Sequence, residues 1–351
     1  MTEVLGLPIP GWEDGDLRQT ANANFGLGND AGLPESIRFL VGVARAIRKR
    51  HQEAGMGSEQ TPAIFFLRPT GVANVSEEMR KQPMLDNGQT QLGGSFWFVG
   101  PPVCRALGLP VPDWSEDGKI FDKAINDLDL GDVPAVFFDP RGKRPTLRHY
   151  PAGLARADEV VVSALTGGMD IDRVIEIIED ETQAHLDGPA GGANLWKDPK
   201  KHWPSDRAEK KIQFALKVAM HHAFPTAVIR EEQPQMAGRL DLEVEEPLLE
   251  EGEFIRHAIL ELKVLRSFRS TGSKVSPKEV REIVKEGVGQ AISYRKERKA
   301  KSAALCCFDM RVKSAREKCF SGVTAKAERE KLELQVWPIY ASAAERRAAN
   351  R

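Results

Sequence analysis

The stretch that decides the fold is GRLDLEVEEPLLEEGEFIRHAILELKVLR, residues 238–266. Near its start Leu240, Leu242 and Val244 alternate with charged residues, which is the period of a β-strand with one apolar face. In such a strand Asp241 points away from the packed side. We therefore predict a strand that is apolar on one face and charged on the other.

A second predicted strand, Phe254–Leu265, carries two charged residues inside an apolar run. Alternation puts Glu261 and Lys263 on one face, about 6 to 7 Å apart along the strand. Charges in an apolar strand are costly unless they are paired or bind a metal. Two other Glu-x-Lys triplets lie in amphipathic helical segments: Glu209/Lys211 and Glu297/Lys299. The apolar setting therefore singles out Glu261 and Lys263.

The loop between the two strands, Glu245–Glu253, contains Pro and Gly and predicts a hairpin-like connection that brings Asp241 beside Glu261. Two converging carboxylates repel each other, and a hard divalent cation with oxygen ligands relieves that repulsion. We therefore expect Mg²⁺ here, with Mn²⁺ as a substitute. Such an ion polarises a phosphodiester and lowers the pKa of a bound water, while Lys263 positions the water or stabilises the transition state.

The flanking residues predict the element order αβββαββ. Ser205 is placed to cap the first helix, and apolar residues at helical spacing continue it. The predicted helices are Asp206–His222 and Pro277–Arg298, and the predicted strands are Ala227–Glu232, Arg239–Glu245, Phe254–Leu265, Ala303–Asp309 and Leu332–Tyr340.

These residues and this order resemble the PD-(D/E)xK nuclease superfamily over about residues 205–340. The resemblance implies an α/β fold with a restriction-endonuclease-like αβββαβ core, in which helices flank a mixed central sheet. It also implies metal-dependent hydrolysis of DNA phosphodiesters, with Asp241 and Glu261 as metal ligands and Lys263 in the Lys role. The proline that gives the motif its first letter is absent, because Leu240 precedes Asp241.

Two further features match the superfamily. Glu209, in the first helix, resembles the additional acidic residue that many members use as a metal ligand. Gln290 and Tyr294 lie at i and i+4 on one helix face and resemble the supporting Gln-xxx-Tyr pair of RecB-type nucleases. Each feature has a plain alternative, because the helix dipole favours Glu209 and amphipathic helices often contain such pairs. For the three central residues the alternative is an ion pair on an exposed sheet face.

The function predicted from these residues is a Mg²⁺-dependent DNA nuclease, an endonuclease rather than an exonuclease, in a prokaryotic DNA defence or processing system. The contrasting hypothesis is a non-catalytic module on the same fold that binds nucleic acid or protein. One site per chain would favour a homodimer for cutting both strands.

Charge is distributed unevenly although the net charge is only −1. Residues 191–351 contain 32 Lys+Arg and 23 Asp+Glu, whereas residues 1–190 contain 18 and 28. The basic half is suited to DNA, and the acidic half is compatible with a partner protein. We predict an N-terminal α+β recognition or regulatory domain of unassigned fold over 1–187, a linker over 188–204 and the nuclease domain over 205–351.

In the N-terminal domain, periodicity and apolar runs predict helices at Glu35–His51 and Asp170–Gln183 and strands at Ala63–Leu67, Phe96–Val99, Ala135–Phe138 and Val160–Leu165. Within the linker, Trp196–Trp203 interleaves aromatic and basic residues. Stacking on bases is one interpretation, and a linker packed through its tryptophans is the favoured one. Basic residues near the C-terminal core offer phosphate contacts: Lys210, Lys211, Lys217, Arg266, Arg269, Lys274, Arg295, Lys296, Arg298, Lys299 and Lys301.

The remaining composition excludes several classes of protein. The longest apolar runs are of strand length, far below the roughly 20 residues of a membrane helix. The acidic start, MTEVLGLPIPGWEDGD, lacks the pattern of a signal peptide, so we expect a cytoplasmic protein without a membrane partner. The cysteines have no zinc-binding spacing and predict neither a zinc site nor a disulfide framework: Cys104, Cys306, Cys307 and Cys319.

Overall fold

The computed structural model describes residues 32–54, 60–67, 80–82, 91–100, 106–141, 145–156, 161–164, 169–188, 193–235, 238–247 and 254–349. The acidic start, Cys104, residues 189–192 of the predicted linker and residues 248–253 of the acidic loop lie outside these ranges. The contacts divide the chain into two units, Met1–Gly167 with His221–Thr226 and Gly168–Met220 with Ala227–Arg351. None of the helices in the described ranges combines the length and apolar character that a membrane crossing requires.

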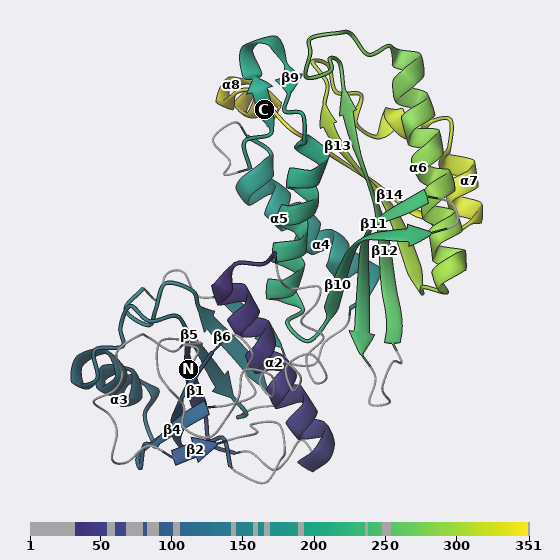
Figure 1. The fold of residues 1–351 in the computed structure, drawn as a ribbon. Coiled ribbons are helices and arrows are strands. Elements are labelled where there is room, and N and C mark those ends of the chain that lie inside the picture. The colour runs from purple at the N-terminus through teal and green to yellow at the C-terminus, as the bar shows by residue number, and fades with distance from the viewer. Residues whose placement is uncertain are drawn as a thin grey trace, which may run out of the picture. The chain divides into compact units, whose positions relative to one another are not determined.

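The first unit is built on a seven-stranded sheet (Figure 1). Its strands are β1 (Ala63–Leu67), β2 (Arg80–Gln82), β3 (Ser95–Val99), β4 (Ala106–Pro110), β5 (Ala135–Asp139), β6 (Thr146–Tyr150) and β7 (Val161–Ala164). Their order in the sheet is β2-β4-β3-β1-β5-β6-β7. The β1–β3 pair is parallel and the other neighbours are antiparallel.

Helices cover both faces of this sheet. They are α2 (Glu35–Ala54), α3 (Asp117–Asp122) and η3 (Lys123–Asp127). Phe65 of β1 joins the core cluster that contains α2, whereas Ile64 and Phe66 join the cluster that contains Ile120 of α3. Coverage of both faces explains why β1 is a continuous apolar run rather than an alternating one.

The second unit contains a five-stranded mixed sheet. Its strands are β10 (Val228–Gln235), β11 (Gly238–Pro247), β12 (Phe254–Arg266), β13 (Ser302–Met310) and β14 (Glu333–Pro338), in sequential order. The neighbours β10, β11 and β12 are antiparallel, and β12, β13 and β14 are parallel. The described chain is therefore mixed α/β, and each large sheet has parallel and antiparallel neighbours.

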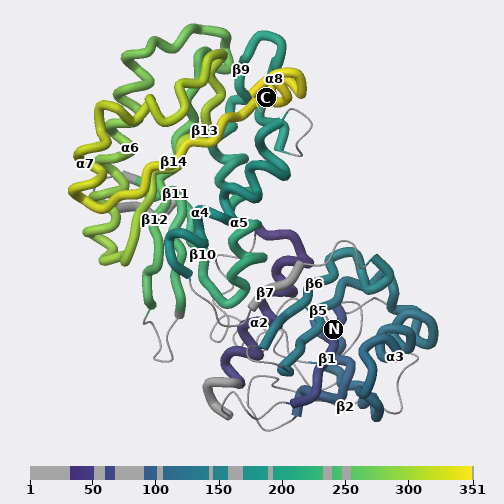
Figure 2. The backbone as a smooth tube through the Cα atoms, turned by 180° about the vertical axis from the view of Figure 1, so that it is seen from behind, coloured from purple at the N-terminus to yellow at the C-terminus, as the bar shows by residue number. Residues whose placement is uncertain are grey.

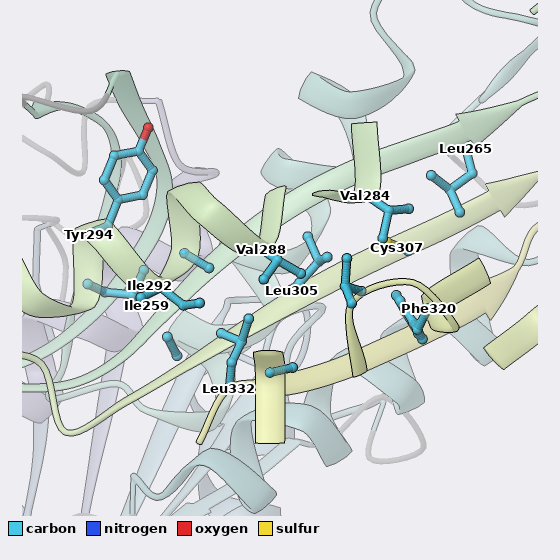
Figure 3. Packing of buried hydrophobic residues seen from close by; sticks show 14 of the residues in the cluster. Ile259, Leu265, Val284, Val288, Ile292, Tyr294, Leu305, Cys307, Phe320 and Leu332 are labelled. Carbon is cyan, nitrogen blue, oxygen red and sulfur yellow. The ribbon is translucent and has the colours of Figure 1, made fainter. Parts of the chain in front are cut away.

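Helices also flank this second sheet. They are α4 (Ile171–Glu181), η5 (Thr182–Leu186), α5 (Ala208–Ala223), α6 (Pro277–Arg298), η7 (Arg316–Phe320), α7 (Thr324–Arg329) and α8 (Ala343–Ala349). Figure 3 shows Val284 and Val288 of α6 against Leu305 of β13, in a core that also includes η7 and α7. Figure 1 shows α4 and α5 on the opposite side of the sheet. The helix α6 is the crossover that parallel β12 and β13 require.

The elements predicted for residues 206–340 are confirmed with small shifts in their bounds. The helix Pro277–Arg298 has the predicted bounds, because Ser276 and Glu279 form a reciprocal capping box around Pro277 at its first turn. In the first unit β4 and β6 were not predicted, because Ala106–Pro110 contains Gly and Pro and Thr146–Tyr150 is interrupted by charged and polar residues.

The division into units differs from the predicted boundary at 188–204. The helix α4 belongs to the second unit, because it contacts β12 and β13. Part of the predicted linker is also ordered as β8 (Trp196–Asp198), η6 (Pro199–Lys201) and β9 (Trp203–Pro204), with β8 and β9 antiparallel. The indole Nε1 of Trp196 donates to the carbonyl of Tyr340 at 3.0 Å, which attaches this segment to the second unit.

Part of the charged face of β11 is buried, contrary to the expected two-sided strand. Glu243 and Glu245 are both 0% exposed, as are the apolar residues that alternate with them. Three guanidinium groups neutralise the two carboxylates. Arg298 donates to Glu243 at 2.9 to 3.2 Å and to Glu245 at 3.1 Å, while Nε of Arg256 and of Arg230 donates to Glu245 at 3.1 and 2.5 Å. The sequence pattern predicted that these carboxylates face solvent, but in the structure they form ion pairs with arginines instead.

We predict that Arg298→Ala lowers the free energy of unfolding by about 3 kcal/mol, because it leaves the buried carboxylate of Glu243 undercompensated. Urea denaturation measures the loss. The matched control is Lys296→Ala, two residues earlier on α6, whose exposed ion pair with Glu330 is worth at most about 1 kcal/mol. Equal losses from both substitutions would contradict a structural role for the buried cluster.

Candidate active site

The structure brings Asp241 and the Glu261/Lys263 pair together at the centre of the second sheet. The pairing of β11 with β12 reaches Leu242 opposite Leu260. One residue earlier on β11, Oδ2 of Asp241 accepts a hydrogen bond of 2.8 Å from the amide of Leu262. The carboxylate of Asp241 is thus attached to the residue between Glu261 and Lys263.

Glu261 is buried, with 1% of its surface exposed. Its Oε1 accepts a hydrogen bond of 2.5 Å from Nζ of Lys263. Its Oε2 is also buried and has no hydrogen-bond partner among the described residues. Because a buried carboxylate oxygen without a donor is costly, this atom is the point of the site that can gain most from a ligand.

The electrostatic surroundings shift the titration of both charged residues on β12. Burial, reinforced by the nearby charges of Asp241 and Glu209, raises the pKa of Glu261 from 4.5 to about 8. Burial is the largest influence on Lys263 and lowers its pKa, but Glu261, Asp241 and Glu209 together outweigh burial and raise the pKa of the ammonium. Lys263 is therefore a firmly protonated cation, and Glu261 holds a proton that a bound cation can displace.

The helix α5 contributes to the site from its first two turns. Glu209 is exposed in the first turn, and its charge acts on both Glu261 and Lys263. One turn later Gln213 is 5% exposed and donates from Nε2 to the backbone carbonyl of Asp241 at 2.7 Å. We did not identify Gln213 from the sequence. The sequence feature that could have identified it is its position on the helix. Gln213 is polar, yet it follows the buried Ile212 directly and precedes Leu216, on the predicted apolar face, by three residues.

The helix α6 approaches the site from the other side of the strand pair. Tyr294 is fully buried in the α6 core, and burial together with the charge of Glu261 raises the pKa of its phenol. Gln290, one turn earlier, is partly exposed. Gly287 allows α6 to lie close to the aliphatic part of the Lys263 side chain. If residue 287 had a Cβ atom, that atom would lie 2.7 Å from Cδ1 of Leu305 and 3.2 Å from Cγ of Lys263.

The described residues contain no group of three or more His, Cys, Asp or Glu side chains that could hold a metal ion. Two carboxylates nevertheless fit Mg²⁺, which proteins commonly bind through one or two carboxylates while water and phosphate oxygens complete the octahedron. Asp241 and the unpartnered Oε2 of Glu261 are those two groups. A cation coordinated by Oε2 of Glu261 would compensate for the hydrogen bond that this oxygen lacks.

The alternatives considered for the sequence can now be compared with the geometry. An ion pair on an exposed sheet face does not fit Glu261, because its side chain is buried. Cys306 and Cys307 are free and buried in β13, and burial raises the pKa of both thiols, which suits small core residues. Cys319 is free and partly exposed.

Comparisons of the chain with protein-family models, curated proteins and solved structures gave no match. Interpretation of the site therefore rests on its own residues and their geometry.

We predict that Gly287→Ala destabilises the protein by about 1 to 3 kcal/mol, because the new methyl group displaces Leu305 and the stem of Lys263. The matched control is Gly289→Ala in the same helix, where nothing lies within 4 Å of an added Cβ. There alanine is expected to stabilise by about 0.5 to 1 kcal/mol, because it restricts the unfolded chain. Opposite signs in urea denaturation support the close contact, and equal effects contradict it.

The protonation of Glu261 predicts a pH-dependent stability. Because its pKa is raised from 4.5 to about 8 on folding, the folded protein binds this proton more tightly than the unfolded chain does. The contribution to stability is complete below pH 4.5 and is lost as the pH rises through about 8. We expect Glu261→Gln to flatten the decline in unfolding free energy across this window.

Urea denaturation of wild type, Glu261→Gln and Glu286→Gln at several pH values measures this effect. Glu286 is exposed on α6 and serves as the control, so its substitution should leave the slope unchanged. Identical slopes for wild type and Glu261→Gln would show that Glu261 titrates normally.

Proposed function

We propose that this protein is a Mg²⁺-dependent DNA nuclease with Asp241, Glu261 and Lys263 at its active site. The single observation that carries the proposal is the buried Oε2 of Glu261, which lacks a hydrogen-bond partner among the described residues and lies beside a second carboxylate and a partly buried Lys. A fold maintained only for stability gains nothing from such an atom, whereas a cation-binding site requires it.

The same sheet contains an internal comparison that supports this interpretation. Glu243 and Glu245 are as deeply buried as Glu261, but three arginines saturate them. Glu261 has one Lys, on one of its two oxygens. The two carboxylates with a structural role are therefore compensated, whereas Glu261, which the sequence predicts as a metal ligand, keeps one oxygen without a hydrogen-bond partner among the described residues.

The element order supports membership of the PD-(D/E)xK superfamily. The series α5, β10, β11, β12, α6, β13 corresponds to αβββαβ, with the acidic residue Glu209 on the first helix and Gln290/Tyr294 on the second. A mixed sheet with two antiparallel neighbours followed by parallel ones is compatible with a restriction-endonuclease-like core. We therefore propose that the second unit has the PD-(D/E)xK fold.

The proposed roles follow from the contacts of each residue. Asp241 and Glu261 would hold the cation, and Glu209 would add negative charge at its outer side. A bound Mg²⁺ supplies Lewis-acid polarisation of the phosphodiester and lowers the pKa of water. Lys263 is positioned by Oε1 of Glu261 and remains protonated, so its ammonium can stabilise negative charge that develops on phosphate oxygens. Gln213 orients Asp241 through its backbone and is a positioning residue.

We predict that Asp241→Ala, Glu261→Gln and Lys263→Ala each reduce Mg²⁺-dependent cleavage of plasmid DNA at least about a hundredfold, because each removes a group that acts on the reacting phosphate. DNA binding and the fold are expected to persist. Glu209→Ala should cause a smaller loss. The control is the double variant Lys285→Ala/Glu286→Gln, which removes an exposed Lys and Glu from α6 and should leave cleavage unchanged.

Cleavage that persists in a pure Asp241→Ala preparation would contradict the assignment of the site. DNA binding without cleavage by wild type, in Mg²⁺ and in Mn²⁺, would instead support a non-catalytic nucleic-acid-binding module. Unchanged activity of Glu209→Ala would return that residue to a helix-dipole role.

A further inference from the structure

One group of basic residues in the second unit is engaged within the protein. At the C-terminal end of α6, Arg298 neutralises Glu243 and Glu245, and Lys296 forms an ion pair of 2.8 Å with Glu330. Arg295 donates to the carbonyl of Lys331 at 2.9 Å. Lys217 on α5 is 3% exposed. These cations serve the fold and are poorly placed to contact a ligand.

The second group lies where β12 leads into α6. Residues 267–275 fold back on themselves there, with Phe268 bridged to Lys274 and the amide of Arg269 donating to the carbonyl of Ser273 at 2.8 Å. Gly272 closes the turn with a φ of +86°, in the left-handed region that glycine adopts without strain. This hairpin begins directly after Arg266, the last residue of β12.

The hairpin is packed against the β8–β9 segment. A Cβ on Gly272 would lie 2.4 Å from Cζ2 of Trp203, so the glycine backbone rests against the indole ring. Nζ of Lys201 lies 4.8 Å from the centroid of the same ring. Figures 1 and 2 show β9 at the end of the second unit where α6 begins. Two segments about 70 residues apart in sequence thus form one basic surface.

The aromatic residues in this surface are engaged in packing. Trp196 donates its Nε1 to Tyr340 and has its ring 5.8 Å from that of His202, edge to face. Trp203 lies between Gly272 and Lys201. These contacts leave the tryptophans as anchors of the segment, in agreement with the interpretation favoured for the sequence. Contacts with a ligand at this surface would then come from cations rather than from stacked bases.

Four further cations belong to the segments that form this surface. Lys201 is paired with Asp198, and Arg269 with Glu279. By contrast, no ion pair within the described ranges involves the following side chains: Lys197, Lys200, Arg266 and Lys274. Lys197, Lys200 and Lys274 are exposed and Arg266 is partly exposed. Arg266 follows Lys263 by three residues on β12, about 10 Å further along the strand, and the alternation of side chains puts it on the opposite strand face at the end of β12.

We propose that Lys197, Lys200, Arg266 and Lys274 form a phosphate-binding rim that holds the backbone of duplex DNA next to the cleavage site. The inference rests on the proposed nuclease function and specifies its substrate. Uncompensated cations attract a polyanion through counterion release, and the partly exposed tryptophans are engaged in packing rather than presented for stacking on unpaired bases. A duplex presents phosphates outward and keeps its bases inside, which matches this surface. Because the rim contacts the phosphate backbone of the DNA, its binding does not depend on the DNA sequence.

The test is binding of a fluorescein-labelled DNA duplex to the full chain, measured by fluorescence anisotropy in EDTA over a range of salt concentrations. The quadruple variant Lys197→Ala/Lys200→Ala/Arg266→Ala/Lys274→Ala should bind at least tenfold more weakly than wild type. The slope of log affinity against log salt should shrink by about 3 to 4, because each lost phosphate contact removes roughly 0.9.

The matched control removes four exposed cations from α6, η7 and α7: Lys285, Lys318, Lys326 and Arg329. It makes the same change in net charge and should retain most of the affinity and the salt slope. Equal losses for the two quadruple variants would overturn the rim, because the effect would then follow net charge alone. A rim-dependent loss seen with single-stranded DNA or RNA but absent with the duplex would overturn the duplex assignment.

Failure of the rim can be distinguished from failure of the nuclease function. Hydrolysis of bis(p-nitrophenyl) phosphate in Mg²⁺ or Mn²⁺ needs the active site but not a DNA backbone. The rim variant should retain this hydrolysis, and Glu261→Gln should lose it. Loss in the rim variant would place these cations in the active site itself and contradict a separate binding surface.

Discussion

Burial of Glu261 inside a strand is the constraint on which the second unit depends. The strand β12 has neighbours on both sides and helices on both faces, and Glu261 is only 1% exposed, so solvent cannot compensate its charge. The protein meets this cost with Lys263 on one oxygen, with a pKa raised to about 8 and with an open second oxygen. An apolar residue would cost less free energy at this position, and the cation site that we propose would account for a carboxylate there.

The elements around β12 act as supports for that residue. The helix α5 fixes Asp241 through Gln213, and the backbone amide of Leu262 fixes its carboxylate. The helix α6 comes close enough to confine the stem of Lys263 because position 287 is glycine. Packing of α6 and hydrogen bonds from Gln213 and from the amide of Leu262 thus preorganise Asp241, Glu261 and Lys263. Such support is what a site for charge stabilisation needs before substrate arrives.

The arginine cluster and the phosphate-binding rim occupy different parts of the same unit. Around Glu243 and Glu245, three guanidinium groups form ion pairs with buried carboxylates, and these pairs stabilise the fold. Where β12 leads into α6, Arg269 pairs with Glu279, and on the adjoining segment Lys201 pairs with Asp198. Among the described residues, no ion pair involves the four basic side chains of the rim. Counting basic residues in the sequence could not separate these groups, because pairing depends on partners from distant segments.

The sequence by itself predicted α5, α6 and the five strands of the large sheet in the second unit, and it singled out the three central residues of the candidate site. Local signals suffice for these, namely alternation in β11 and β12 and the capping box that starts α6. Only the tertiary structure decided that the charged face of β11 is buried, that α4 belongs to the second unit and that Gln213 holds Asp241. Burial and pairing are properties of surfaces that meet in space, and a periodicity within one segment does not encode which other segment covers it.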